Sequence, residues 1–293
     1  MTSAVNRLPD GTIELTISVP WVDVKAVYDH VVDHAVENAE IAGFRKGKAP
    51  RNVVEEKLDK SKIYEEVLKE LIPKVYNEAV AAQKIKPIVT PKVELKEASE
   101  GKDWSLRLLT CERPAVTLKE YKKAISDLKA SKTKKIWTPG QDLPAGRQEP
   151  TPEEKEKEIK PTLDELLKAL YDNVTITLPT ILLDQEINRL LSELIDQTKK
   201  LGLTVEQYLV STGRNADALR HEYEGQAKRT LTLEFSLEEI ADKEGILVSD
   251  DDIDTVIKSS KTDDEREALT KQRYYLASVL RRQKTLDFLA SIN

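Results

Sequence analysis

The sequence predicts two parts: an α+β domain at the N-terminal end and an all-α domain with extended helical arms at the C-terminal end. Three observations lead to this prediction. Strand-like and helical patterns alternate over residues 1–115, a basic helical stretch and a proline-rich linker occupy residues 116–161, and helical patterns follow one another over residues 162–293. At 293 residues, the chain is long enough to build two hydrophobic cores.

The α+β domain begins with a half-buried strand at residues 12–19. Apolar and polar residues alternate there, which places the apolar set on one face of the strand. Apolar residues at helical spacing then predict a helix over residues 21–41. Pro50 suits the first turn of a short second helix, where its missing N–H costs nothing. The apolar face of the strand consists of Ile13, Leu15, Ile17 and Val19.

A longer helix is predicted from Ser61, which can cap its N-terminus, to Val80. Pro73 interrupts the apolar stripe of this helix, but the stripe resumes in phase, so we expect a kink rather than an end. Two strand-like runs, "PKVELKE" and "WSLRLLTCE", are joined by the turn-rich "ASEGKD". This pattern predicts a hairpin that closes the domain.

The composition changes between the two domains. Residues 118–128 show weak helical spacing and several lysines, while residues 131–161 hold five of the 13 prolines and almost no apolar periodicity. Such a composition is typical of a linker.

The C-terminal part is predicted to be helical, with "NVTITLP" as its one strand-like run. A helix starts near Pro179, residues 204–245 hold a short and a long helical pattern, and Ser249 with Asp252 resembles a capping box. A last, uninterrupted helix is predicted over residues 263–292.

Charge and composition argue against several classes of protein. The net charge is −6, and residues 151–293 hold 29 acidic and 20 basic residues, which opposes a general nucleic-acid binder there. Cys111 is the single cysteine, and no apolar stretch is long enough for a signal peptide or a membrane span. We therefore expect a cytoplasmic protein with no membrane contact. No "GxxxxGK" loop occurs, and no cofactor is expected.

The stretch "IAGFRKGKAP" predicts an exposed loop between two helices. Gly43 and Gly47 let the chain turn sharply and present what lies between them. Phe44 offers an apolar anchor, and the neighbouring cations can meet carboxylates or phosphates. These cations are Arg45, Lys46 and Lys48.

The charge of this loop is uncompensated in the sequence. No acidic residue occurs between Glu40 and Glu55, so Arg51 adds a fourth cation nearby. The loop is suited to a surface that has an apolar pocket beside anionic groups. The alternative is an ordinary helix–helix turn with a solvated charge run, in which Phe44 folds back onto the core.

Two histidines raise a second hypothesis, that of a metal site. His30 and His34 stand four residues apart on one predicted helix. However, Val31 occupies the place of the general-base Glu in an "HExxH" motif, and His221 is distant in the sequence. We therefore expect no metal site.

The eight residues "GFRKGKAP", preceded by the strand "ELTISVP" and a helix, resemble the ribosome-docking signature of the bacterial trigger factor family. The resemblance covers the first 120 residues and resumes at "ITLPTILLDQEINRLLSEL". It implies an ATP-independent chaperone whose partners are the ribosome and nascent or unfolded polypeptides. Whether the chain forms a homodimer off the ribosome, or acts as a holdase or adaptor without the ribosome, stays open.

The resemblance also implies roles for the loop residues. Phe44, Arg45 and Lys46 would make the main contact with a protein at the ribosomal exit tunnel and with adjacent ribosomal RNA. Gly43, Gly47 and Lys48 would shape and support that contact. The basic stretch over residues 116–135 is a candidate for a second, weaker contact with ribosomal RNA.

Most members of the family carry a prolyl isomerase domain of the FK506-binding type between these two halves. Between Arg113 and Pro161 the chain has fewer than 50 residues, no Phe, and only Tyr121 and Trp137 as aromatic residues. Such a segment cannot close a barrel of about 100 residues. We therefore expect no isomerase domain and no enzyme, with residual isomerase activity as the alternative.

Client binding requires adaptable apolar surface, and the predicted helices of the C-terminal part supply candidates for it. Apolar stripes on helices are usually core, and the sequence does not separate core from exposed positions. The candidates are Leu182, Ile187, Leu191, Tyr208, Tyr223, Phe235, Tyr274, Tyr275 and Phe288.

Overall fold

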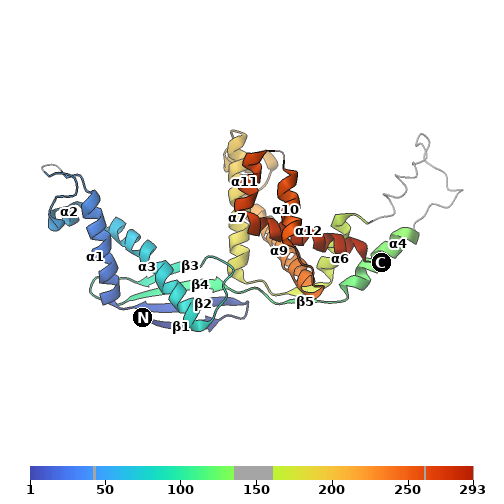
Figure 1. Cartoon of the computed structure of the whole chain (residues 1–293), viewed down its shortest axis with the longest axis horizontal. Helices are drawn as coiled ribbons and strands as arrows, with labels where there is room; N and C mark the ends of the chain where they lie inside the picture. The colour runs from blue at the N-terminus through green and yellow to red at the C-terminus, as the bar shows by residue number, and fades with distance from the viewer. Residues whose placement is uncertain (42–43, 135–160, 261, 293) are drawn as a thin grey trace. The chain divides into compact units, whose positions relative to one another are not determined.

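The computed structural model describes residues 1–41, 44–134, 161–260 and 262–292, and the chain divides into two compact units (Figure 1). The first unit consists of residues 1–114 together with 179–185. The second unit consists of residues 115–178 and 186–293.

A four-stranded antiparallel sheet forms one layer of the first unit. Its strands lie in the order β1-β2-β4-β3, so the predicted hairpin of β3 and β4 is confirmed. The edge strand β1 was not predicted, because its sequence "TSAVNR" has little apolar alternation. The strands are β1 (Thr2–Arg7), β2 (Thr12–Val19), β3 (Lys92–Glu97) and β4 (Trp104–Cys111).

Two helices, α1 (Trp21–Asn38) and α3 (Lys60–Gln83), pack over the sheet, while α2 (Arg51–Lys57) lies at the far end of α1 (Figure 1). Pro73 lies inside α3, so the proline does not end the helix, and the expected kink stays a prediction. The core combines the predicted face of β2 with β4 and the helices, and includes Ile13, Leu15, Ile17, Val19, Val24, Val32, Val67, Leu71, Trp104, Leu106 and Leu108.

The second unit is mostly helical, with one small antiparallel pair of strands, β5 (Val116–Leu118) and β6 (Val174–Ile176). Its helices are α4 (Tyr121–Lys134), α6 (Leu163–Asp172), α7 (Thr180–Lys200), α8 (Val205–Thr212), α9 (Ala216–Lys243), α10 (Asp250–Ser259), α11 (Asp263–Lys271) and α12 (Arg273–Ser291). The first residues of α7 belong to the first unit.

Helix α4 is part of the second unit's hydrophobic core. Tyr121 and Ile125 are buried there against α6, α9 and α12. The helix extends to Lys134, which is inside the range 131–161 that the proline content marks as linker. The remainder of that linker, from residue 135 to 160, lies outside the described residues.

The prediction of one uninterrupted helix over residues 263–292 was wrong. The helix breaks at Gln272, which ends α11 and precedes α12. After the break, Arg273 reaches Asp250 and Asp254 of α10 with nitrogen–oxygen distances of 2.9 and 2.6 Å. Neither glycine nor proline marks this break, so the sequence pattern could not reveal it. The capping box of Ser249 and Asp252 is confirmed.

The first turn of α7 is capped from the other end of the chain. The carboxylate of Asp10 accepts hydrogen bonds from the backbone N–H and the hydroxyl of Thr180, at 3.0 and 2.7 Å. These bonds satisfy donors that the start of a helix leaves free.

Within the described ranges, no helix combines the length and the apolar character that a membrane span requires.

Candidate functional site

The loop between α1 and α2 folds back onto the last turn of α1. The backbone N–H of Gly47 donates to the carbonyl oxygen of Ala39 at 3.1 Å. Within the loop, Phe44 N–H donates to Ile41 O at 3.0 Å and Lys48 N–H to Arg45 O at 2.9 Å. Backbone hydrogen bonds therefore hold the described residues of the loop in place between two helices.

Gly47 occupies a position that only glycine fits well. Its φ is +68°, a left-handed conformation that L side chains rarely adopt. A Cβ atom at this position would lie 2.7 Å from the carbonyl oxygen of Glu37, which is backbone and cannot move aside easily. The role expected for Gly47 in shaping the loop has a physical basis. Gly43 lies outside the described residues.

The side chains of the loop point to solvent. Phe44 is 44% exposed and lies outside the core of the first unit, so it does not fold back as the alternative interpretation required. Arg45, Lys46 and Lys48 are also exposed. Ala49 is buried, and Pro50 directly precedes α2. The loop therefore presents one aromatic ring and three cations from a base that is anchored at both ends.

The charges of the loop are not equivalent. Lys46 lies 3.4 Å from the carboxylate of Glu40. Among the residues that the structure describes, neither Arg45 nor Lys48 has an ion-pair partner. These two side chains are the cations most available to a partner.

Arg51 is not the uncompensated fourth cation that the sequence indicated. Its guanidinium contacts Asp29 at 2.5 Å and Asp33 at 3.1 Å, both on α1. The hydrogen bond that Arg51 donates to Asp29 raises the pKa of Arg51 above its ordinary value. Asp29 and Asp33 are one helical turn apart, so Arg51 ties the start of α2 to α1.

Among the described residues, the two histidines of α1 do not belong to a cluster of metal-ligating side chains. His30 Nδ1 lies 3.2 Å from a carboxylate oxygen of Glu70, and both side chains are exposed. In the described part of the chain, no three residues of the types His, Cys, Asp and Glu come together as they would around a metal ion.

The nine candidate client-binding residues are distributed over three environments. Leu182, Ile187 and Phe235 are buried. Leu191, Tyr208, Tyr223 and Phe288 are partly buried. Tyr274 and Tyr275 are exposed, Tyr274 to 92%. Of the nine, these two tyrosines are the most exposed.

Tyr274 borders a groove that sequence reasoning missed. The groove has a volume of about 530 Å³ and is lined mainly by apolar side chains of α9, α12 and the segment before α10. Leu247 in that segment is 76% exposed. Leu247 lies between two helices and not on the apolar stripe of either, so the helical pattern of the sequence does not single it out. The apolar lining includes Leu237, Ala241, Leu247, Val248, Tyr274 and Ala277.

Some lysines of the basic stretch already have partners inside the second unit. Lys122 contacts Glu244 at 2.7 Å and Lys132 contacts Glu165 at 2.6 Å. Lys119 and Lys123 remain exposed. The positive charge that a nucleic acid could meet here is therefore smaller than the sequence indicated.

An exposed aromatic anchor beside available cations, and an open apolar groove on a separate unit, are features of a protein that binds other macromolecules. Comparison with known families makes this class specific. A family model described as "Bacterial trigger factor protein (TF)" matches residues 1–136, and one described as "Bacterial trigger factor protein (TF) C-terminus" matches residues 147–291. The chain belongs to the trigger factor family.

Curated relatives match the N-terminal part. The chain is 36% identical over 122 residues to the trigger factor of Desulforudis audaxviator, which is 42% of this chain and 28% of that protein. It is 33% identical over 129 residues to the trigger factor of Streptococcus mutans, which is 44% of this chain and 29% of that protein. The match thus spans less than a third of the length of either relative.

One solved structure shares the fold of the whole chain. It is described as "Promiscuous Substrate Recognition in Folding and Assembly Activities of the Trigger Factor Chaperone". The TM-score is 0.62 at 16% sequence identity, and the match covers 99% of this chain and 100% of that one.

The two family models leave only residues 137–146 between them. Ten residues cannot fold into a domain of the FK506-binding type. The chain therefore lacks the region that would hold the isomerase domain.

Proposed function

We propose that this protein is an ATP-independent, cytoplasmic chaperone that docks beside the exit tunnel of the bacterial ribosome and holds nascent or unfolded chains. The observation that carries the proposal is the placement of Phe44 beside Arg45. Both are exposed, and Arg45 has no ion-pair partner among the described residues. The loop that carries them is fixed by the bond from Gly47 to Ala39.

The loop chemistry suits a partner with an apolar pocket next to anionic groups. Burial of the Phe44 ring in a partner's pocket lowers the free energy of binding. The side chain has few rotatable bonds, so it loses little conformational entropy when it is fixed. Arg45 can form a bidentate pair with a carboxylate or a phosphate, as a ribosomal protein and the adjacent RNA would offer. Lys46 is drawn toward Glu40, so its contribution is smaller than that of Arg45.

Clients are held on the apolar groove of the second unit. Tyr274 and Leu247 stand at its open side, where an unfolded chain can bury apolar side chains without displacing the core. The acidic composition of residues 151–293 keeps this surface soluble and favours basic clients.

Isomerase activity is not part of the proposal. The ten residues between the two family models leave no room for the catalytic domain, and the apolar groove needs no catalytic group to hold a client. A proline-peptide refolding assay tests this point. An acceleration that copurifies with the protein would show the residual activity that this account rejects.

Co-sedimentation with bacterial ribosomes tests the docking role. The test variant carries Phe44→Ala, Arg45→Ala and Lys46→Ala. The matched control removes one exposed apolar residue and two exposed cations elsewhere in the first unit, through Val22→Ala, Lys62→Ala and Lys74→Ala.

We expect the wild type and the control to pellet with ribosomes and the loop variant to stay in solution. If all three pellet equally, the loop is not the anchor. If none pellets, the docking part of the proposal fails, and a holdase or adaptor without the ribosome is the alternative that remains.

A further inference from the structure

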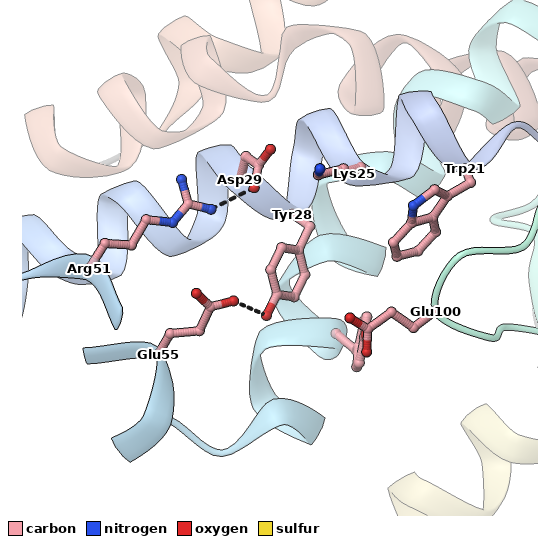
Figure 2. Close-up of a pocket in the computed structure, with 8 residues that line it drawn as sticks. Trp21, Lys25, Tyr28, Asp29, Arg51, Glu55 and Glu100 are labelled. Carbon is pink, nitrogen blue, oxygen red and sulfur yellow. Dashed lines mark hydrogen bonds and ion pairs between the residues drawn. The ribbon is translucent and has the colours of Figure 1, made fainter. Parts of the chain in front are cut away.

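A cavity of about 220 Å³ lies beside α1 in the first unit, apart from the docking loop (Figure 2). Trp21 and Tyr28 project from α1 on the same side, and Tyr64 lines the cavity from α3. Glu55 of α2 and Glu100 of the segment between β3 and β4 complete the surroundings of the three rings. Aromatic faces and carboxylates therefore meet around one small space.

Part of the aromatic wall is continuous with the core of the unit. The ring centroids of Tyr28 and Tyr64 are 5.7 Å apart, and those of Tyr64 and Trp104 are 5.6 Å apart, both in tilted arrangements. Trp104 is only 2% exposed and belongs to the core of the unit. The row of rings thus connects the cavity wall to the core, so a ligand would meet aromatic side chains that are already held in place by packing.

The two carboxylates retain capacity for a ligand. Tyr28 donates its hydroxyl hydrogen to Oε1 of Glu55 at 2.7 Å, and within the described chain Oε2 of Glu55 has no hydrogen-bond donor. Glu100 lies 3.7 Å from Lys60 Nζ, a long contact between two exposed side chains. Burial raises the pKa of both tyrosines, and the negative charges of Glu55 at Tyr28 and Glu100 at Tyr64 raise each pKa further.

The cations of the cavity do not neutralise it. Arg51 turns toward Asp29, as Figure 2 shows, and the two charges cancel at a distance of 2.5 Å. Of the remaining charges in the lining, Lys25 faces Glu55 and Glu100, so the lining residues carry one net negative charge. Lys60 lies outside the lining and reaches only Glu100, at 3.7 Å.

We propose that this cavity binds an arginine side chain of a polypeptide partner. The volume is below the roughly 300 Å³ at which small-molecule sites begin, which suits one side chain. A guanidinium group is planar, stacks on aromatic rings, and donates several hydrogen bonds in a fork that matches a carboxylate. The ammonium of lysine lacks the plane and the fork, so arginine is preferred.

The first part of the test measures binding of a small probe to the full chain. Acetyl-Gly-Arg-Gly-amide is titrated into nitrogen-15-labelled protein, and the indole N–H signal of Trp21 is followed by NMR. The same peptide with citrulline in place of arginine keeps the shape of the side chain but has no charge. We expect a saturable shift with the arginine peptide and none with the citrulline peptide.

The second part compares variants. The double variant Glu55→Gln and Glu100→Gln should bind the arginine peptide about tenfold more weakly. The control double variant Glu56→Gln and Glu97→Gln changes two exposed glutamates outside the cavity and should bind as the wild type does. An unchanged indole signal of Trp104 reports that the core of each variant is intact.

Three results would overturn the proposal: no saturable shift with the arginine peptide, equal binding of the citrulline peptide, or undiminished binding by the Glu55 and Glu100 variant. The cavity shares no residue with the docking loop. The variant with Phe44, Arg45 and Lys46 changed to Ala should therefore bind the arginine peptide normally. A failure of ribosome docking and a failure of this site are thus distinguishable.

Discussion

The backbone N–H of Gly47 lies 3.1 Å from the carbonyl oxygen of Ala39, so the end of the loop is tied to the end of the helix that precedes it. This bond and the left-handed conformation of Gly47 fix where Phe44 and Arg45 are presented. Sequence similarity points to these residues as a docking signature, and the geometry explains why a glycine is needed at the fifth position of "GFRKG".

Gly47→Ala should weaken ribosome binding and lower the free energy of unfolding by about 1–3 kcal/mol. The added Cβ would lie 2.7 Å from the carbonyl oxygen of Glu37, so the loop must shift. Chemical denaturation and co-sedimentation measure the two effects. Gly213→Ala is the control, because Gly213 has a similar φ of +64° but open space around it. Equal effects of both variants on ribosome binding would contradict the argument.

Arg45→Ala should reduce the affinity for ribosomes about tenfold, whereas Arg51→Ala should change it little. The reason is that Arg51 already contacts Asp29 and Asp33, while Arg45 has no ion-pair partner among the described residues. Arg51→Ala should instead cost about 0.5–1 kcal/mol of stability, because the pair is partly exposed. Ribosome binding at several salt concentrations measures the difference. If Arg51→Ala lost more affinity for ribosomes than Arg45→Ala, the contact with the ribosome would belong to Arg51, and the prediction would be wrong.

The double variant Tyr274→Ser and Leu247→Ser should suppress aggregation of an unfolded client less well than the wild type. Both side chains border the apolar groove and are largely exposed, so the stability of the chain should change by less than about 0.5 kcal/mol for each. Val210→Ser, an exposed apolar position outside the groove, is the control. Full activity of the double variant would remove the groove from the account.

Asp252 should make the stability of the second unit depend on pH in the acidic range. Its hydrogen bond from Lys284, together with those from Ser249, lowers the pKa of Asp252 from 3.8 to about 2. Because the folded-state pKa is depressed, the stabilisation is complete above pH ~4 and is lost as the pH falls toward ~2. The stability difference between wild type and Asp252→Asn should therefore shrink below pH ~4.

Urea denaturation from neutral pH down to pH ~3 measures this difference. Asp251→Asn, at the neighbouring exposed position, is the control. A difference that grows on acidification would show that the interaction with Lys284 does not stabilise the folded state.

Ile125→Ala should destabilise the second unit by about 2–4 kcal/mol, because a fully buried side chain of α4 is truncated. Lys123→Ala, on the exposed side of the same helix, should stay within about 0.5 kcal/mol of the wild type. Thermal or chemical unfolding distinguishes the two. If both variants are neutral, residues 121–134 are not part of the folded unit.

Local patterns predicted most of the elements of the fold. The alternation of Ile13, Leu15 and Ile17 predicted β2, and the Ser249 capping box predicted the start of α10. Elements that depend on distant partners were missed. β5 pairs Val116 with Ile176 over three residues, which is too short to give a pattern.

The same limit applies to the contacts around the candidate site. Arg51 appears free in the sequence because its partners, Asp29 and Asp33, belong to another helix. Thr180 is capped by Asp10, a residue 170 positions away. The motif located the loop, but only the packing of α2 against α1 reveals which of its cations remain available.

Site-specific photo-cross-linking to the ribosome tests the docking claim most directly. Benzoylphenylalanine replaces Phe44 in one sample and Val22, an exposed residue of α1 away from the loop, in another. We expect a cross-link from position 44 to a ribosomal protein at the exit tunnel and none from position 22. Cross-links from position 22 without any from position 44 would contradict it, because the ribosome would then contact a different face of the first unit.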